Sequence, residues 1–295
     1  MHNSPLVSVI IPAYNVEKYI DDCLKSVFAQ SYQNFEIIVI DDGSTDSTTE
    51  KVKGYEDSRL RYYYQENSGV SKARNYAMSL AKGNYVALLD SDDWWHEDKL
   101  EKQLKVLEDE SIDVSYTNQY LTDEFGTIID SQSVNGFSGD ISDQIISQNF
   151  VNTSSAVIRK SFLDKVWGKY DESYPVCEDW FFWFFLAING AKYHFLEERM
   201  TPYRQVSSSL SKDFDKMYEK ALELLEYFEA FCIEKGFKSK LVFVKEGKFF
   251  QELKYAHRLL SQSNKKQAYR HFMKALKLKP LSLRPYWGMV KGIFT

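Results

Sequence analysis

Residues 35–46 read F-E-I-I-V-I-D-D-G-S-T-D, a largely apolar run that ends in two adjacent acids. An apolar run of this length, closed by turn-forming residues, is typical of a buried strand. The pattern occurs before it at residues 6–15 (L-V-S-V-I-I-P-A-Y-N) and after it at residues 85–93 (Y-V-A-L-L-D-S-D-D). Each run predicts a strand followed by a loop of polar or aromatic residues.

Helical patterns separate these strands. Apolar residues recur at intervals of three and four between residues 20 and 28, 70 and 80, and 100 and 107, as in helices that bury one face. Gly83 is expected to close the second of these helices. Between the first two, residues 44–46 can cap a short helix, and residues 60–64 read as another strand.

The alternation of strand and helix predicts an α/β fold with a mostly parallel sheet and helices on both faces. Such sheets bind ligands beyond the carboxyl ends of their strands. We therefore expect the chemistry in the loops at residues 12–15, 41–44 and 90–93.

The remaining residues are mixed and then helical. Strands are expected near residues 113–119, 154–158, 192–196 and 200–204, with a helix from Asp179 to Asn189. From Asp213 onward the pattern is helical and includes helices at about 241–261 and 265–278, and Pro280 and Pro285 interrupt the end.

Composition excludes several classes of protein. The chain has 295 residues, 44% of them hydrophobic, and a formal net charge of −5, values typical of a globular protein. Its three cysteines are far apart, which argues against a disulfide scaffold or a zinc ribbon and suits the cytoplasm. No secretory signal pattern is visible, and the longest apolar run is too short for a membrane span.

Charge is unevenly distributed. Residues 236–295 contain 14 Lys and Arg but only two Asp and Glu, whereas the rest of the chain is acidic. With Tyr286, Trp287, Ile293 and Phe294, this segment suits a helix lying on an anionic membrane. Alternatively, it packs on the acidic part of the chain, or forms a helical hairpin for self-association. Nucleic acid is a poor fit for so acidic a protein.

Established phosphate, zinc and serine-hydrolase motifs are absent from the sequence, which leaves its carboxylates as the candidate chemistry. Asp90 and Asp92 are hard oxygen ligands of the kind that hold Mg²⁺ or Mn²⁺ together with a ligand's phosphates. Alternatively, Asp92 and Asp93 cap the helix that follows. Asp42 can accept hydrogen bonds from a base or ribose, although D-D-G-S is also ordinary turn sequence.

Two further segments carry polar groups near apolar stripes. Arg74 lies near the core-facing side of its helix, where a guanidinium needs a carboxylate or a nucleotide as partner. Glu178 and Asp179 begin the aromatic helix E-D-W-F-F-W-F-F. They either favour the helix dipole or place a general base beside a stacking wall for a sugar.

Six blocks in order resemble glycosyltransferase family 2, which has the GT-A fold. They are V-S-V-I-I-P-A-Y-N (7–15), V-I-D-D-G-S-T-D (39–46), S-G-V-S-K-A-R-N (68–75), Y-V-A-L-L-D-S-D-D (85–93), E-D-W (178–180) and Y-R-Q-V-S-S-S-L-S (203–211). The resemblance implies a catalytic domain at residues 1–212, with a nucleotide-binding half (1–110) and an acceptor half (111–212). Residues 213–295 are then a basic helical C-terminal region.

The resemblance also implies how a nucleotide sugar, most simply a UDP-sugar, would bind. Pro12 and Tyr14 would flank the uracil ring, and Asp42 would accept from the uracil imide. Arg74 would lie against the base and its carboxylate partner. Asp90, with Ser91 beside it, would lie near the ribose.

By the same resemblance, Asp92 would bind the divalent metal, Mn²⁺ or Mg²⁺, and Asp179 would be the catalytic base of an inverting hexosyl transfer. The lower-ranked acceptor candidates are Trp94, Trp95, Glu178, Trp180 and Arg204. Family members commonly carry a His where this chain has Val206, which leaves Arg204 and the Ser207–Ser209 run as candidates for the diphosphate.

The implied partners are a nucleotide-sugar donor and a glycan or lipid-linked acceptor in surface polysaccharide synthesis. A homo-oligomer is possible, and so is a peripheral position on the inner face of the plasma membrane. Two other functions remain open. A sugar-phosphate nucleotidyltransferase would share the sheet, acids and metal, but would need a glycine-rich basic loop near the N-terminus. A non-catalytic sugar-nucleotide-binding protein would not need Asp179.

Overall fold

The computed structural model describes residues 4–130, 135–174, 176–206 and 213–294, without the side chains of residues 292–294. The Ser207–Ser209 run and the Ile293 and Phe294 side chains lie outside this description. The chain forms two compact units. One contains residues 1–141 and 150–209, and the other contains residues 142–149 and 210–295.

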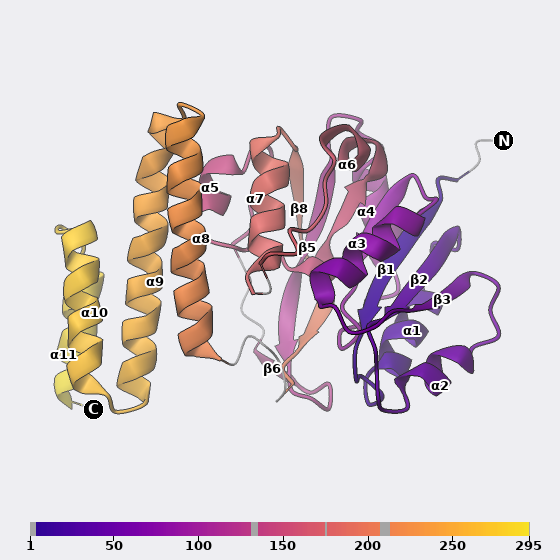
Figure 1. Ribbon diagram of the computed structural model, residues 1–295, viewed down its shortest axis with the longest axis horizontal. Helices are drawn as coiled ribbons and strands as arrows, with labels where there is room; N and C mark the ends of the chain where they lie inside the picture. Colours follow the sequence, from indigo (N-terminus) through magenta and orange to yellow (C-terminus); the bar gives the residue numbers. More distant parts are fainter. Residues whose placement is uncertain (1–3, 131–134, 175, 207–212, 295) are drawn as a thin grey trace. The chain divides into compact units, whose positions relative to one another are not determined.

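The first unit is built on an eight-stranded sheet (Figure 1). Its first half has the predicted parallel order β3-β2-β1-β4. The strands are β1 (Val7–Ala13), β2 (Phe35–Asp41), β3 (Leu60–Tyr64) and β4 (Tyr85–Leu88). The helices between and after them are α1 (Ile20–Phe28), α2 (Thr48–Lys53), α3 (Val70–Leu80) and α4 (Lys99–Val106). The expected α/β fold is therefore confirmed.

The second half of the sheet mixes directions. Antiparallel β7 (Val157–Arg159) joins β4 to β5 (Val114–Thr122), which pairs in parallel with β8 (Tyr193–Arg204) and antiparallel with β6 (Ile128–Asp130). Helix α6 (Lys160–Val166) follows β7, and α7 (Glu178–Ile188) precedes β8.

Two expectations for this half were wrong, and one strand was not expected. Residues 153–155 form a 3₁₀ turn, η1, so the strand expected at residues 154–158 begins only at Val157. The strands expected at 192–196 and 200–204 are one strand, whose pairing with β5 shifts register around Asn118. The short edge strand β6 was not foreseen, because all three of its residues are exposed and carry no alternating pattern.

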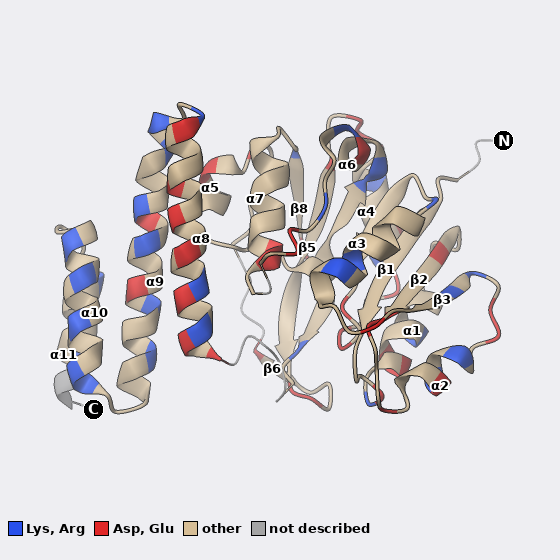
Figure 2. Cartoon of the chain, viewed as in Figure 1, with Lys and Arg blue, Asp and Glu red and all other residues tan. Residues whose placement is uncertain are grey.

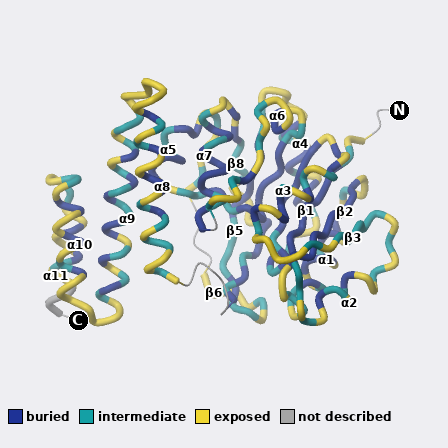
Figure 3. Tube along the Cα trace, in the orientation of Figure 1, coloured by how far each residue is buried: buried dark blue, intermediate teal, exposed yellow. Residues whose placement is uncertain are grey.

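The core explains why the parallel strands read as continuous apolar runs. Every residue of β1, β2 and β4 is buried, because helices cover both faces (Figure 3). Glu36 and Asp41 are the acids among them, and Glu36 accepts hydrogen bonds from Ser8, Arg61 and the Lys82 amide. These bonds offset the penalty of burying its charge.

Gly83 does not close α3 as expected, because that helix ends at Leu80 with Ala81 as its C-cap. Instead, the glycine lies against β1. A Cβ added there would be 2.6 Å from the Ser8 nitrogen and 2.7 Å from the Leu6 carbonyl oxygen. The position therefore needs glycine for a close backbone approach.

The second unit is helical. It contains α5 (Ser142–Ser147), α8 (Phe214–Glu234), the short 3₁₀ turn η3 (Lys238–Lys240), α9 (Leu241–Ser261), α10 (Lys265–Leu278) and α11 (Arg284–Phe294). Helices α9 and α10 coincide with the predicted ranges. Pro285 does not interrupt the end but occupies the first turn of α11, where its missing N–H is not needed. Among the described residues, no helix is both long and apolar enough to cross a membrane.

Candidate active site

The loops after β1, β2 and β4 meet at the carboxyl edge of the sheet, as the fold rule predicts. The first two are braced against each other. The Asn15 amide donates to the Ser44 hydroxyl at 3.0 Å, and the Asn15 side chain accepts from the Thr45 amide at 2.8 Å. Asn15 has a positive φ of 51°, a conformation that asparagine tolerates better than most residues. The brace leaves Tyr14 as an exposed ring beside buried Pro12.

Asp42 is buried at the end of β2 and holds the start of α3. Its carboxylate accepts from the Gln65 side chain at 2.6 Å and from the amides of Ser68 and Gly69 at 2.9 and 2.8 Å. A carboxylate has about four acceptor positions, so these three bonds leave little capacity for a base imide. The predicted contact with uracil is untested, and the observed bonds give Asp42 a structural role.

The neighbouring Asp41 is fully buried. It accepts from the Ser44 amide, Thr49 and Tyr62. Burial raises the pKa of this carboxyl, but these hydrogen bonds outweigh it, so the pKa lies below its ordinary value. Asp41 therefore stays ionised and fixes the D-D-G-S turn.

Arg74 connects two parts of the site that are distant in sequence. Its guanidinium donates to Asp90 at 2.7 Å and to Glu178 at 2.9 Å, and it lies over the Tyr170 ring at 4.9 Å. Burial alone would lower the pKa of Arg74, but Asp90 and Glu178 more than offset it. The partner expected for this guanidinium is thus a pair of carboxylates, one at the end of β4 and one at the start of α7.

The acids after β4 are in three environments. Asp90 pairs with Arg74, while Asp93 is fully buried and accepts from the Ser154 hydroxyl and the Arg204 amide. Burial, followed by the charges of Asp92 and Asp90, raises the pKa of Asp93 well above its ordinary value. Neither Asp92 nor Asp93 caps the next helix, whose N-cap is Asp98.

Asp92 is the acid best suited to a cation. Burial, and then the charge of Asp90, raises the pKa of its carboxyl to about 6. This excess negative charge is what a divalent cation would relieve. Among the described residues, no group of three or more His, Cys, Asp and Glu is placed to hold a metal. Asp90 and Asp92 are the carboxylates of this loop whose oxygens are of the kind that Mg²⁺ or Mn²⁺ binds.

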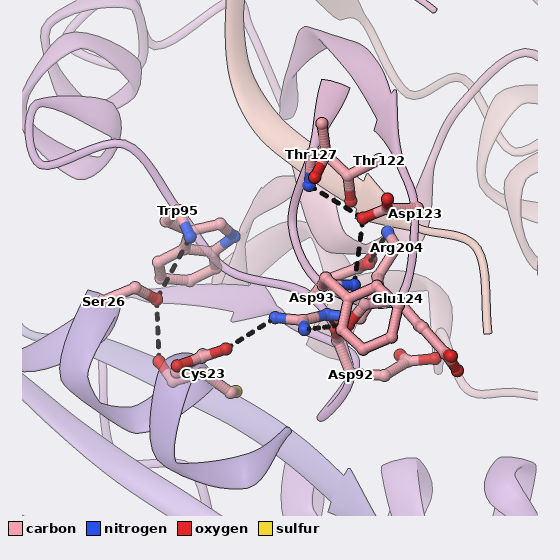
Figure 4. A network of polar contacts seen from close by, with 12 residues as sticks. Cys23, Ser26, Asp92, Asp93, Trp95, Thr122, Asp123, Glu124, Thr127 and Arg204 are labelled. Carbon is pink, nitrogen blue, oxygen red and sulfur yellow. Dashed lines mark hydrogen bonds and ion pairs between the residues drawn. The ribbon is translucent and has the colours of Figure 1, made fainter. Parts of the chain in front are cut away.

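Arg204, at the end of β8, forms hydrogen bonds with the backbone of the loop that contains Asp92 (Figure 4). It donates to the carbonyl oxygens of Asp92 and Glu124 at 2.9 and 2.8 Å and to the Asp22 carboxylate at 2.8 Å. The buried guanidinium also lies 4.6 Å from the ring centre of Trp94. These contacts give Arg204 the role of positioning the loop. Its predicted contact with acceptor or diphosphate is untested.

The start of α7 brings in the candidate base. Glu178 pairs with Arg74, and the half-buried Asp179 accepts from the Trp180 amide at 2.7 Å. Arg74 lies over the Tyr170 ring and donates to both Asp90 and Glu178, so these two carboxylates meet at one guanidinium. The two acidic segments thus face the same place.

The remaining predicted residues lie at different depths. Trp94 is partly exposed, whereas Ser91, Trp95 and Trp180 are buried. The Trp95 indole donates to the Ser154 carbonyl at 2.6 Å. Of the three tryptophans predicted to contact the acceptor, Trp94 is thus the one whose ring is partly exposed to solvent. Val206 is also buried.

Sequence reasoning missed three supporting residues. Ser154 donates to Asp93 and accepts from the Asp90 amide, Tyr170 supports Arg74, and Asp22 pairs with Arg204. Each acts through a partner that is distant in sequence, so no local pattern marks it. The one indication in the sequence was the adjacent pair Asp92 and Asp93 after an apolar strand, because a carboxylate buried there needs a hydrogen-bond donor nearby.

A model of glycosyl transferase family 2 matches residues 8–167 of the chain. The chain is 48% identical over 129 residues to Bacillus subtilis TuaG, a glycosyltransferase named for teichuronic acid biosynthesis, covering 43% of this chain and 51% of that protein. It is 41% identical over 121 residues to Escherichia coli WfaP, named as a UDP-Glc:α-D-GlcNAc-diphosphoundecaprenol β-1,3-glucosyltransferase, covering 41% and 48%. The matches thus span about half the length of these relatives.

Solved structures share the fold. Staphylococcus aureus TarS residues 1–349, in complex with UDP-GlcNAc, has a TM-score of 0.69 at 20% identity, covering 98% of this chain and 88% of that one. The mannosyltransferase PcManGT from Pyrobaculum calidifontis, in complex with GDP-Man and Mn²⁺, has a TM-score of 0.64 at 19% identity, covering 99% and 81%. At these identities the likeness concerns the fold alone.

Proposed function

The chain belongs to glycosyl transferase family 2, and from this we propose that it transfers a sugar from a UDP-sugar to a hydroxyl of a glycan or lipid-linked acceptor. The observation that carries the proposal is the Arg74 bridge, which joins the D-S-D-D loop to the E-D start of α7. A donor-binding loop and a candidate base on one scaffold are what a transfer reaction requires. Relatives named for teichuronic acid synthesis and for a diphosphoundecaprenol acceptor support a role in surface polysaccharide synthesis.

In the proposed reaction, Asp179 takes the proton from the acceptor hydroxyl as its oxygen attacks the anomeric carbon. The bond from that carbon to the donor's diphosphate oxygen breaks, and UDP leaves. A single displacement inverts the anomeric configuration. Asp92, with Asp90 beside it, would hold Mn²⁺ or Mg²⁺, which supplies charge stabilisation for the departing diphosphate.

The surrounding residues would bind and orient the donor. Tyr14 is exposed and rigidly presented by the Asn15 brace, so it can stack on the uracil. Arg204 keeps the Asp92 backbone in place, and Trp94 offers its partly exposed ring to the acceptor. Asp42 would support the base indirectly, by holding the loop at residues 65–69.

The test is a panel of nucleotide sugars assayed for Mn²⁺-dependent release of nucleotide, with the wild type and Asp179→Asn in parallel. A transferase releases nucleotide with the wild type and not with Asp179→Asn, while both bind UDP. A non-catalytic binding protein would show the same negligible release for both variants.

A nucleotidyltransferase is a weaker alternative. It would need a basic phosphate-binding loop after β1, but that loop carries Tyr14, Asn15 and Glu17 and is bonded to residues 44–48.

We further propose that the protein acts on the inner face of the plasma membrane, close to a lipid-linked acceptor. Self-association through the helical region stays a prediction.

A further inference from the structure

Helix α11 and Leu283, the residue just before it, present large apolar side chains to solvent. Tyr286 and Val290 are 48% and 44% exposed, and the larger values are 69% for Leu283 and 67% for Trp287. The four residues follow the spacing i, i+3, i+4, i+7, so they share one face. We call this set the α11 apolar face. An amphipathic surface helix normally turns such a face inward, so this one needs an external partner.

The packing on the opposite side of α11 fixes the rotation of the helix about its own axis, so its apolar face cannot turn inward. Pro285 is buried, and a Cβ added at Gly288 would lie 2.4 Å from the Phe272 ring. The helix packs through these small or cyclic residues because α10 approaches too closely for larger ones. The outward position of the apolar residues is therefore built into the packing.

A cavity of about 530 Å³ lies beside the α10–α11 turn. Its wall includes Phe249 and Phe250, and Arg284 lies 5.8 Å from the centre of the Phe250 ring. Lys279 and Glu246 also line the cavity and form an ion pair with each other. Leu281, which also lines the cavity, is 97% exposed. The cavity thus combines an apolar wall, the Arg284 guanidinium and an edge with an exposed leucine.

Charge indicates what covers this surface. Residues 265–291 contain eight Lys and Arg and no Asp or Glu, and blue residues line α10 in Figure 2. A second copy of the chain docking here would bring two such basic surfaces together, which is unfavourable. A bilayer with anionic lipids offers the complementary charge and an apolar layer at the same place.

We propose that the α11 apolar face and the α10–α11 turn dock on an anionic lipid bilayer. Helix α11 lies in the plane of the interface with Leu283 and Trp287 at the acyl boundary. A lipid headgroup phosphate enters the cavity beside Arg284. Binding to the bilayer through this surface does not involve the donor site. If the protein proves not to bind membranes, the proposed transferase activity is therefore unaffected.

The experiment is flotation of the full-length protein with vesicles of phosphatidylcholine containing phosphatidylglycerol, and with pure phosphatidylcholine. The wild type should float only with the anionic vesicles, and high salt should weaken the binding. The double variant L283S/W287S should bind at least about tenfold more weakly. W167S is the matched control, because Trp167 is 85% exposed in the other unit, and it should bind like the wild type.

A second pair of variants separates a specific surface from net charge. R284E and K238E change the charge equally, and both residues are exposed, but only Arg284 lines the cavity. R284E should weaken binding more than K238E, and soluble glycerophosphoglycerol should compete only at high concentration. The proposal is wrong if the wild type fails to bind anionic vesicles at low salt, or if L283S/W287S floats like the wild type. It is also wrong if the α11 apolar face proves to mediate a dimer, seen as a mass in solution that L283S/W287S halves.

Discussion

The guanidinium of Arg74 lies 2.7 Å from the Asp90 carboxylate and 2.9 Å from that of Glu178. This one side chain joins the end of β4 to the start of α7. Because the candidate metal ligand is two residues after Asp90 and the candidate base directly follows Glu178, Arg74 sets the relation between the two. Removing it should affect both folding and the geometry of the site.

Arg74→Met should lower the free energy of unfolding by about 3 kcal/mol, because it leaves two partly buried carboxylates without a counter-charge. Arg74→Lys should lower it less, since one ammonium keeps part of the pairing. Denaturant titration measures both. The control is Arg59→Met, which breaks a part-exposed pair with Asp57 and should lower the free energy by no more than about 1 kcal/mol. Equal effects of Arg74→Met and Arg59→Met would refute the bridging role.

Gly83→Ala should destabilise the sheet by about 2 kcal/mol or more, because the new Cβ would overlap β1 backbone that cannot move freely. At Gly54 an added Cβ would be 3.3 Å from its nearest neighbour, and φ is −71°, so Gly54→Ala is the matched control with little expected effect. Thermal unfolding of the two variants gives the comparison. Similar melting temperatures would mean that the backbone near Ser8 can shift to admit the new Cβ, which would contradict the prediction.

Asp92 should destabilise the metal-free protein at neutral pH. Between its ordinary pKa of 3.8 and about 6, the folded state binds more protons than the unfolded state, so stability falls as pH rises. In EDTA, Asp92→Asn should therefore raise the free energy of unfolding by about 1–3 kcal/mol near pH 7. The gain should shrink as the pH falls through about 6 and vanish below 3.8, where the carboxyl is protonated in both states. A gain that is independent of pH would contradict this account.

Arg204→Lys should weaken Mn²⁺-dependent UDP binding by about ten- to a hundredfold, the usual effect of losing a residue that orients a metal ligand. The ammonium cannot reach the carbonyls of Asp92 and Glu124 and the Asp22 carboxylate together. Calorimetry with UDP and Mn²⁺ measures the change. Asp22→Asn removes only the half-exposed partner of Arg204 and should have a smaller effect. If Arg204→Lys binds UDP in the presence of Mn²⁺ as tightly as the wild type, Arg204 does not position the Asp92 loop for metal binding.

Local patterns predicted the parallel half of the sheet and the three loops at its edge, because strands buried on both faces read as plain apolar runs. They failed where tertiary contacts decide. Residues 153–155 form a turn because Asn152 accepts from the Ser154 amide, and Ser154 is drawn towards Asp93. Strand β8 continues through exposed Glu197 and Glu198 because β5 keeps it paired on both sides of the register shift.

The candidate site was predictable in its residue types but not in its pairings. The sequence indicated that Arg74 needs a partner, yet Glu178 is brought to it only by the fold. Arg204 was likewise predicted to contact a ligand, whereas its guanidinium donates to Asp92, Glu124 and Asp22 of the protein itself. Pairings across the sheet depend on strand order, which no local spacing encodes.

In the proposed function, Asp92 and Asp179 act on one bound nucleotide sugar. The most direct measurement is UDP binding and sugar transfer for wild type, Asp92→Ala and Asp179→Asn, each with and without Mn²⁺. Asp92→Ala should lose the Mn²⁺-dependent part of UDP binding, and Asp179→Asn should keep binding while transfer falls by about 10²-fold or more. Normal transfer by Asp179→Asn, or unchanged Mn²⁺-dependent binding by Asp92→Ala, would contradict the account.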